Sequence, residues 1–85
     1  MRGGELDVVA HRGNIVVVCE VKARATADFG PPMEAITPQK VARVQRAGYA
    51  YLREYLQQHP GQHVQLRFDV ATVLGTQLEV FENFF

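Results

Sequence analysis

Two stretches near the start of the chain show the β-branched composition of strands. The first covers residues 5–11 and the second residues 15–22, and between them Gly13 and Asn14 form a turn signal. Glycine in the first position of a two-residue loop suits a type II′ turn, which pairs Arg12 with Ile15. The pattern therefore predicts a tight antiparallel hairpin.

Apolar residues then recur at helical spacing between residues 38 and 58. Thr37 suits the N-cap, Pro38 suits the first helical position, and Pro60 with Gly61 ends the helix after Gln58. The predicted buried stripe consists of Val41, Val44, Gly48, Tyr51, Leu52, Tyr55 and Leu56. Glycine at position 48 lowers helix stability by about 1 kcal/mol relative to alanine, which indicates a close approach to the sheet.

Two further strands are predicted at residues 64–74 and 77–83, separated by a turn at residues 75–76. The order of elements predicts an α/β fold: a mixed β-sheet with an N-terminal hairpin, one long helix and two C-terminal strands. With 85 residues and 47% hydrophobic content, residues 1–85 are expected to form a single domain.

The composition of the chain indicates the cellular compartment in which the protein is expected. Cys19 is the single cysteine, so no internal disulfide can form, and we expect a buried structural thiol in a reducing cytoplasm. No apolar run approaches the ~20 residues of a membrane helix, and the chain does not open like a signal peptide. We therefore expect a soluble cytoplasmic protein without a membrane partner. The formal net charge of zero lends no support to nucleic-acid binding by bulk electrostatics.

The hairpin register makes a specific chemical prediction. Pairing Arg12 with Ile15 places Asp7 opposite Glu20 and Glu5 opposite Lys22, all on one face of the sheet. Carboxylates that face each other at about 4.5–5.5 Å between Cβ atoms repel unless a cation neutralises them. Hard oxygen ligands at this spacing suit Mg²⁺ or Mn²⁺.

Two alternatives stand beside this prediction. A three-residue loop would pair Asp7 with Cys19 and send the two acids to opposite faces. Alternating acids and lysine on a strand are also typical of a solvated sheet face.

The segments GELDVVA and VVVCEVKAR resemble the D…E-x-K signature of restriction-endonuclease-like nucleases, and more narrowly the YraN-like family of small endonuclease-like bacterial proteins. Further matches follow in order at Phe29-Gly30, Pro32, Glu34-Ala35, Lys40 with Arg43, Tyr51-Leu52 and residues 67–70. They run through nearly the whole chain.

The resemblance implies a restriction-endonuclease-like core in which Asp7 and Glu20 hold Mg²⁺ or Mn²⁺ and Lys22 orients or activates the attacking water. With the carbonyl of Val21 as a further ligand, the expected activity is metal-dependent hydrolysis of DNA phosphodiester bonds. Archaeal Holliday-junction resolvases share this core, so branched DNA is the substrate suggested by analogy. Glu5 and Glu34 are accessory candidates.

The chain departs from the family at its start, where relatives carry a helix and a further strand before the G-E-x-D segment. We therefore weigh an alternative, a catalytically impaired module that binds nucleic acid or a protein partner without cleavage. The same departure leaves the edge of the first strand open to pairing, and a homodimer through that edge is expected.

Basic residues gather between positions 40 and 67, whereas the acids concentrate in the hairpin and the tail. Lys40 and Arg43 lie at the start of the predicted helix, a natural anion site, and are expected to bind phosphates. A solvated helix face explains these residues equally well. Asp69 shares a face with Arg67, which favours a structural pair over a metal ligand, and the histidines lack metal-ligand spacing.

Overall fold

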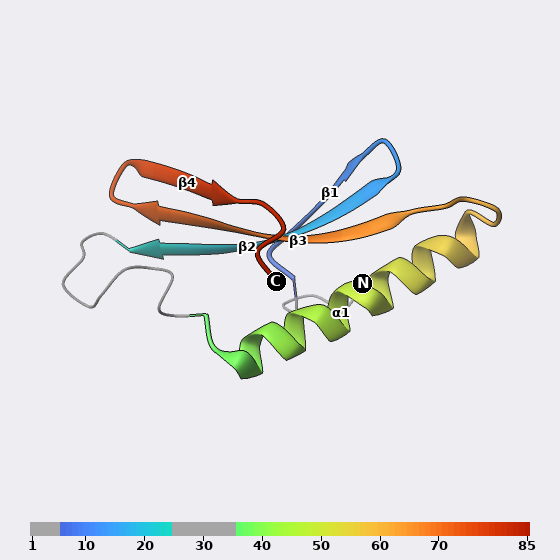
Figure 1. Ribbon diagram of the computed structural model, residues 1–85, viewed down its shortest axis with the longest axis horizontal. Coiled ribbons are helices and arrows are strands. Elements are labelled where there is room, and N and C mark those ends of the chain that lie inside the picture. Colours follow the sequence, from blue (N-terminus) through green and yellow to red (C-terminus); the bar gives the residue numbers. More distant parts are fainter. Residues whose placement is uncertain (1–5, 25–35) are drawn as a thin grey trace.

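The computed structural model describes residues 6–24 and 36–85 of the chain, and in this part it contains four strands and one helix (Figure 1). The elements in chain order are β1 (Val8–Arg12), β2 (Ile15–Arg24), α1 (Pro38–Gln58), β3 (Gln65–Leu74) and β4 (Gln77–Phe81). The strands form one sheet in the order β1-β2-β3-β4. The predicted α/β class, with a mixed sheet and one long helix, is confirmed.

The sheet is mixed because only its central pair is parallel. β2 pairs with β3 in parallel from Ile15 opposite Gln65 to Arg24 opposite Leu74, and α1 makes the connection between these two strands. The outer pairs, β1 with β2 and β3 with β4, are antiparallel hairpins. The second hairpin turns at Gly75-Thr76, as the sequence predicted. In the described sheet, β1 and β4 are the edge strands.

The first hairpin has the predicted register. Arg12 pairs with Ile15 across a two-residue loop, and Gly13 has a φ of 58°, the left-handed value that the first position of a type II′ turn requires. The predicted strand at residues 5–11 was wrong at its start, because β1 begins at Val8. Asp7 lies in a bend before the strand, and its side chain accepts the hydrogen bond from the Val21 N–H. A side chain thus replaces the backbone partner that a longer strand would supply.

The remaining boundaries follow the predictions closely. The Thr37 side chain accepts a hydrogen bond from the Lys40 backbone N–H at 3.2 Å, and α1 begins at Pro38 and ends at Gln58. β2 continues two residues beyond its predicted end, to Arg24, because β3 pairs with it over the whole length. β4 ends at Phe81, two residues before the predicted end.

The core lies between α1 and one face of the sheet (Figure 1). Val18, Val44 and Phe68 form its centre, and Leu6, Val9, Leu66 and Phe85 pack against them. Ala47 joins Val44 and Gly48 as a buried residue of α1, although the sequence analysis did not include it in the stripe. The predicted tyrosines and leucines of the stripe are half-buried, because the C-terminal half of α1 meets the hairpin rather than the centre of the sheet.

The opposite face of the sheet is apolar and partly exposed. Register places Val8, Val21, Leu78 and Val80 on this face, and each is at least one third exposed. In the part of the chain described here, no helix is both long and apolar enough to cross a membrane.

Close approach between α1 and the sheet occurs at Gly48, as predicted. A Cβ atom at this position would lie 2.7 Å from Cε1 and 2.9 Å from Cζ of Phe68. These distances are well below the ~3.5–4.0 Å of ordinary carbon contacts. Phe68 is itself buried and stacks on Phe85, so its ring has little room to move.

We therefore predict that Gly48→Ala destabilises the protein. Overpacking in a core typically lowers stability by about 1–3 kcal/mol, which outweighs the ~1 kcal/mol that alanine gains over glycine in a helix. Urea unfolding measures the net effect. The double variant Gly48→Ala with Phe68→Leu should show a favourable coupling energy, because the shorter side chain removes the clash.

Ala50→Gly is the matched control, since residue 50 is exposed on the same helix and reports helix propensity alone. A Gly48→Ala variant more stable than the parent protein would contradict the close approach.

Candidate functional site

A row of charged side chains continues the buried face of β2 beyond the core. Val16 and Val18 of β2 are fully buried on the side that faces α1, and Glu20 and Lys22 follow on the same side at the two-residue period of a strand. The hairpin register extends to place Asp7 next to Glu20. Glu20 and Lys22 therefore lie on one face with Asp7 beside Glu20, whereas Glu5 lies outside the described residues. The Arg12–Ile15 pairing excludes the alternative with a three-residue loop.

Asp7 is fixed by a backbone group of the neighbouring strand. Its Oδ2 atom accepts a hydrogen bond from the Val21 N–H at 2.9 Å, which leaves Oδ1 for another partner. The N–H and C=O of a residue in an antiparallel pair point to the same neighbouring strand, so the Val21 carbonyl also faces Asp7. This side of β2 therefore presents an exposed carboxylate and a carbonyl oxygen together.

Glu20 is a buried carboxylate with an unsatisfied oxygen. The residue is only 4% exposed, and Oε2 has no hydrogen-bond partner among the described residues. Burial, followed by the negative charge of Asp7, raises the pKa of Glu20 above its ordinary value. A hydrogen bond from the Asp7 backbone N–H, and then the charges of Lys22 and Lys40, oppose the shift. Buried polar atoms in proteins normally have partners, so an unpartnered carboxylate oxygen at this point indicates a ligand site.

Two lysines face the acids from different elements. Lys22 comes from β2 and Lys40 from the first turn of α1, and both are half-buried. Burial is the largest cause that lowers the pKa of Lys22, and the adjacent Lys40 ammonium, by contact and by charge, adds to it. The carboxylates of Glu20 and Asp7 act in the opposite direction. Four charged groups thus meet where α1 begins and β2 leaves the core.

Of the other candidates, only Arg43 lies in the described part of the chain. Arg43 is exposed on α1, three residues after Lys40. Glu5 and Glu34 lie outside the described residues. Within residues 6–24 and 36–85, no group of three or more histidine, cysteine, aspartate or glutamate side chains is placed to hold a metal ion. The donor set available here is two carboxylates and the Val21 carbonyl.

Sequence reasoning missed two features of the site. The Val21 amide that orients Asp7 is a backbone group, so no side chain marks it in the sequence. The contact between Lys22 and Lys40 depends on where α1 begins against the sheet, and residues 18 positions apart carry no local signal of it.

Asp69 has the structural role that was predicted. Arg67 donates two hydrogen bonds to its carboxylate, each at 2.9 Å, and the Asn83 N–H donates a third at 2.9 Å. These three hydrogen bonds satisfy the buried carboxylate of Asp69. It therefore ties β3 to the C-terminal segment and leaves no oxygen without a partner.

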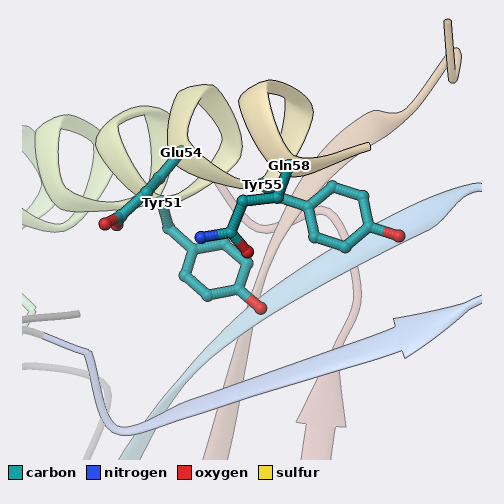
Figure 2. Close-up of a pocket in the computed structure, with 4 residues that line it drawn as sticks. All are labelled: Tyr51, Glu54, Tyr55 and Gln58. Atoms are coloured by element: carbon teal, nitrogen blue, oxygen red, sulfur yellow. The ribbon is translucent and has the colours of Figure 1, made fainter. Parts of the chain in front are cut away.

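A separate shallow pocket lies on the C-terminal half of α1, with a volume of about 170 Å³ (Figure 2). Tyr51, Glu54, Tyr55 and Gln58 line it, and none of the charged residues described above takes part. The Tyr51 hydroxyl and the His11 Nε2 atom lie 2.7 Å apart, and the ring of Tyr55 stacks on His59. The two tyrosines thus pack α1 against the first hairpin, as expected.

We predict that Glu20→Gln raises the stability of the metal-free protein. A carboxyl whose folded pKa lies above its unfolded value stabilises the fold fully below the unfolded pKa, and this contribution is lost as the pH rises through the folded pKa. The parent protein should therefore lose stability as the pH rises from about 4.3, the ordinary pKa of glutamate. Thermal unfolding in EDTA should show a weaker pH dependence and a higher melting temperature for the variant.

Glu54→Gln is the matched control, because it removes the same charge from an exposed helical position. Equal melting temperatures for Glu20→Gln and the parent protein across this pH range would show that the buried carboxylate carries no penalty.

Comparison with known proteins identifies the family of this chain. The sequence model of the "Uncharacterised protein family UPF0102" matches residues 1–73. A UPF0102 protein of Acidothermus cellulolyticus is 43% identical over 79 residues, covering 86% of this chain and 60% of the relative. One from Kineococcus radiotolerans is 47% identical over 73 residues, covering 85% of this chain and 57% of the relative.

A third relative, from Leifsonia xyli, is 51% identical over 55 residues, covering 65% of this chain and 47% of its own length. The chain thus spans less than two thirds of the length of these relatives. The matches confirm the resemblance to YraN-like proteins on which the motif assignment rested. With a family match over 73 of its 85 residues, the chain belongs to the UPF0102 family.

Proposed function

We propose that this protein is a metal-dependent endonuclease that hydrolyses phosphodiester bonds of DNA. The observation that carries the proposal is the buried Oε2 atom of Glu20, which has no partner among the described residues and lies beside the Asp7 carboxylate. Two acids held together at the edge of a core, with lysines next to them, form a site for a cation and an anion at once.

The residues present fit a hard divalent cation. Glu20, Asp7 and the Val21 carbonyl would hold Mg²⁺ or Mn²⁺, which typically bind one or two carboxylates and fill their remaining positions with water and substrate phosphate. When bound, such a cation supplies positive charge to the phosphate and lowers the pKa of water.

The chain's own residues then have distinct tasks. Asp7 is held in place by the Val21 N–H, so its free oxygen is preorganised for a ligand. Lys22 orients or deprotonates the attacking water and stabilises negative charge in the transition state. Its lowered pKa suits proton exchange better than that of an ordinary lysine.

Phosphates next to the reacting one are bound from α1. Lys40 belongs to the first turn of the helix, where backbone N–H groups and the helix dipole favour an anion. That turn contains no acidic residue. Arg43 is exposed beyond it and reaches a more distant phosphate. Branched DNA is the substrate proposed first, by analogy of fold.

The metal site can be tested without measuring activity. Mn²⁺ should raise the melting temperature of the parent protein, because a ligand that binds only the folded state stabilises it by about 2.7 kcal/mol at a hundredfold excess over Kd. Asp7→Asn should abolish the shift, and Glu54→Gln should retain it. A shift of the same size in Asp7→Asn would place the ion elsewhere.

Cleavage tests the chemistry. In Mg²⁺, the parent protein should cut branched, flapped or single-stranded DNA, and EDTA should stop the reaction. Glu20→Gln and Lys22→Ala should each reduce the rate by at least 10²–10³-fold, the usual loss when a group that stabilises the transition state is removed. Gel analysis of labelled oligonucleotides measures both effects.

Glu54→Gln should cut at the parent rate. DNA binding by the parent protein without cleavage in Mg²⁺ or Mn²⁺ would refute the endonuclease proposal and favour a binding module.

A further inference from the structure

Beyond Lys22, the α1-facing row of β2 continues to Arg24. Burial alternates along this end of β2. Lys22 and Arg24 are half-buried, whereas Val21 and Ala23 are exposed on the other face. Parallel pairing with β3 holds this end of β2 straight, since Lys22 lies opposite Thr72 and Arg24 opposite Leu74. In Figure 1, the C-terminal end of β2 extends along the long axis of the molecule past the start of α1.

Arg24 has donor groups that the described residues do not use. Its Nε atom is buried and has no hydrogen-bond partner in residues 6–24 and 36–85. Ion pairs in the same residues involve Arg67 with Asp69 and Glu82, and none involves Arg24. Arg67 provides the comparison with Arg24, because its guanidinium donates two parallel hydrogen bonds to one carboxylate. The guanidinium of Arg24 forms no ion pair with the described residues, and its terminal Nη atoms suit an external oxyanion such as phosphate.

The position of Arg24 relates it to the candidate site. Strand residues rise by about 3.3 Å each, so Lys22 and Arg24 are separated by about 6.6 Å along β2. This separation is close to that of neighbouring phosphates along one nucleic-acid strand.

We propose that Arg24 binds the phosphate adjacent to the one that is cleaved, so that one strand of the substrate runs along β2 from Lys22 to Arg24. This inference rests on the proposed function and adds the direction of the substrate. Contacts to phosphate position a strand and carry no sequence information directly, so the proposed contact is independent of sequence.

The experiment uses oligonucleotides in which a single phosphate is replaced by an uncharged methylphosphonate. With the parent protein, cleavage should fall about tenfold when the uncharged linkage lies one step from the cut on one side, because the charge that Arg24 binds is missing. Arg24→Gln should cut the unmodified strand about tenfold more slowly and lose this dependence on the adjacent linkage. Arg24→Lys, which keeps the charge without the fork, should fall between the two.

Binding in EDTA provides a second readout that does not need cleavage. The slope of log Kobs against log salt should decrease in magnitude by about 0.7–0.9 in Arg24→Gln, the value for one lost phosphate contact. Arg53→Gln, at an exposed position on α1, should keep the parent slope and the parent methylphosphonate profile.

The two proposals fail in different ways. If the parent protein cuts DNA and Arg24→Gln shows the same methylphosphonate profile and the same salt slope, the role of Arg24 is overturned while the endonuclease stands. If the parent protein binds but does not cut DNA, the endonuclease fails, and the salt slope alone decides whether Arg24 binds phosphate.

Discussion

The register of β1 against β2 is the constraint on which the candidate site depends. A two-residue turn with Gly13 at positive φ pairs Arg12 with Ile15, and every later pair follows from that one. Because strand side chains alternate between faces, a slip by one residue would send Asp7 away from Glu20. The hydrogen bond from the Val21 N–H to Asp7 then closes the end of the hairpin and holds the carboxylate where the strand itself has ended.

The burial of Glu20 is unfavourable for its charged carboxylate. β2 contributes Val16 and Val18 to the core, and the next residue on the same face is Glu20, which is also buried. A carboxyl group at this position does not contribute to hydrophobic packing. Desolvation and the charge of Asp7 raise its pKa, and the lysines reduce the penalty only in part. Under these conditions the ionised form of Glu20 is disfavoured in the folded protein, which is the direction in which its pKa is raised.

The same sheet contains a second acid in the opposite situation. Asp69 is as buried as Glu20, yet Arg67 and the Asn83 N–H satisfy its oxygens. Two equally buried carboxylates of one fold thus differ in whether the described residues satisfy their oxygens. Both lie on the central strands, and the difference is the supply of hydrogen-bond donors around each oxygen. A buried acid is therefore informative about function only when its partners are known.

The sequence by itself determined the elements and much of the site. The β-branched run at residues 15–18, the Gly13 turn, the Thr37 cap and Gly48 are local signals, and each acts through backbone preferences or sterics that need no distant partner. Together with the motif around Glu20 and Lys22, they were sufficient for the α/β class, the hairpin register and the family. They did not show that Asp7 lies outside its strand, because the competing hydrogen bond comes from a backbone amide 14 residues away.

Only the tertiary structure decided how the groups work together. The missing partners of the Glu20 Oε2 atom and the Arg24 Nε atom among the described residues are visible only in the folded chain. The approach of Lys40 to Lys22 depends on where α1 begins against the end of β2. That placement results from packing of Gly48 and Val44 on Phe68 and Val18, which are contacts between residues far apart in the chain. Solvation and pairing of charges follow from such contacts, and local sequence patterns do not encode them.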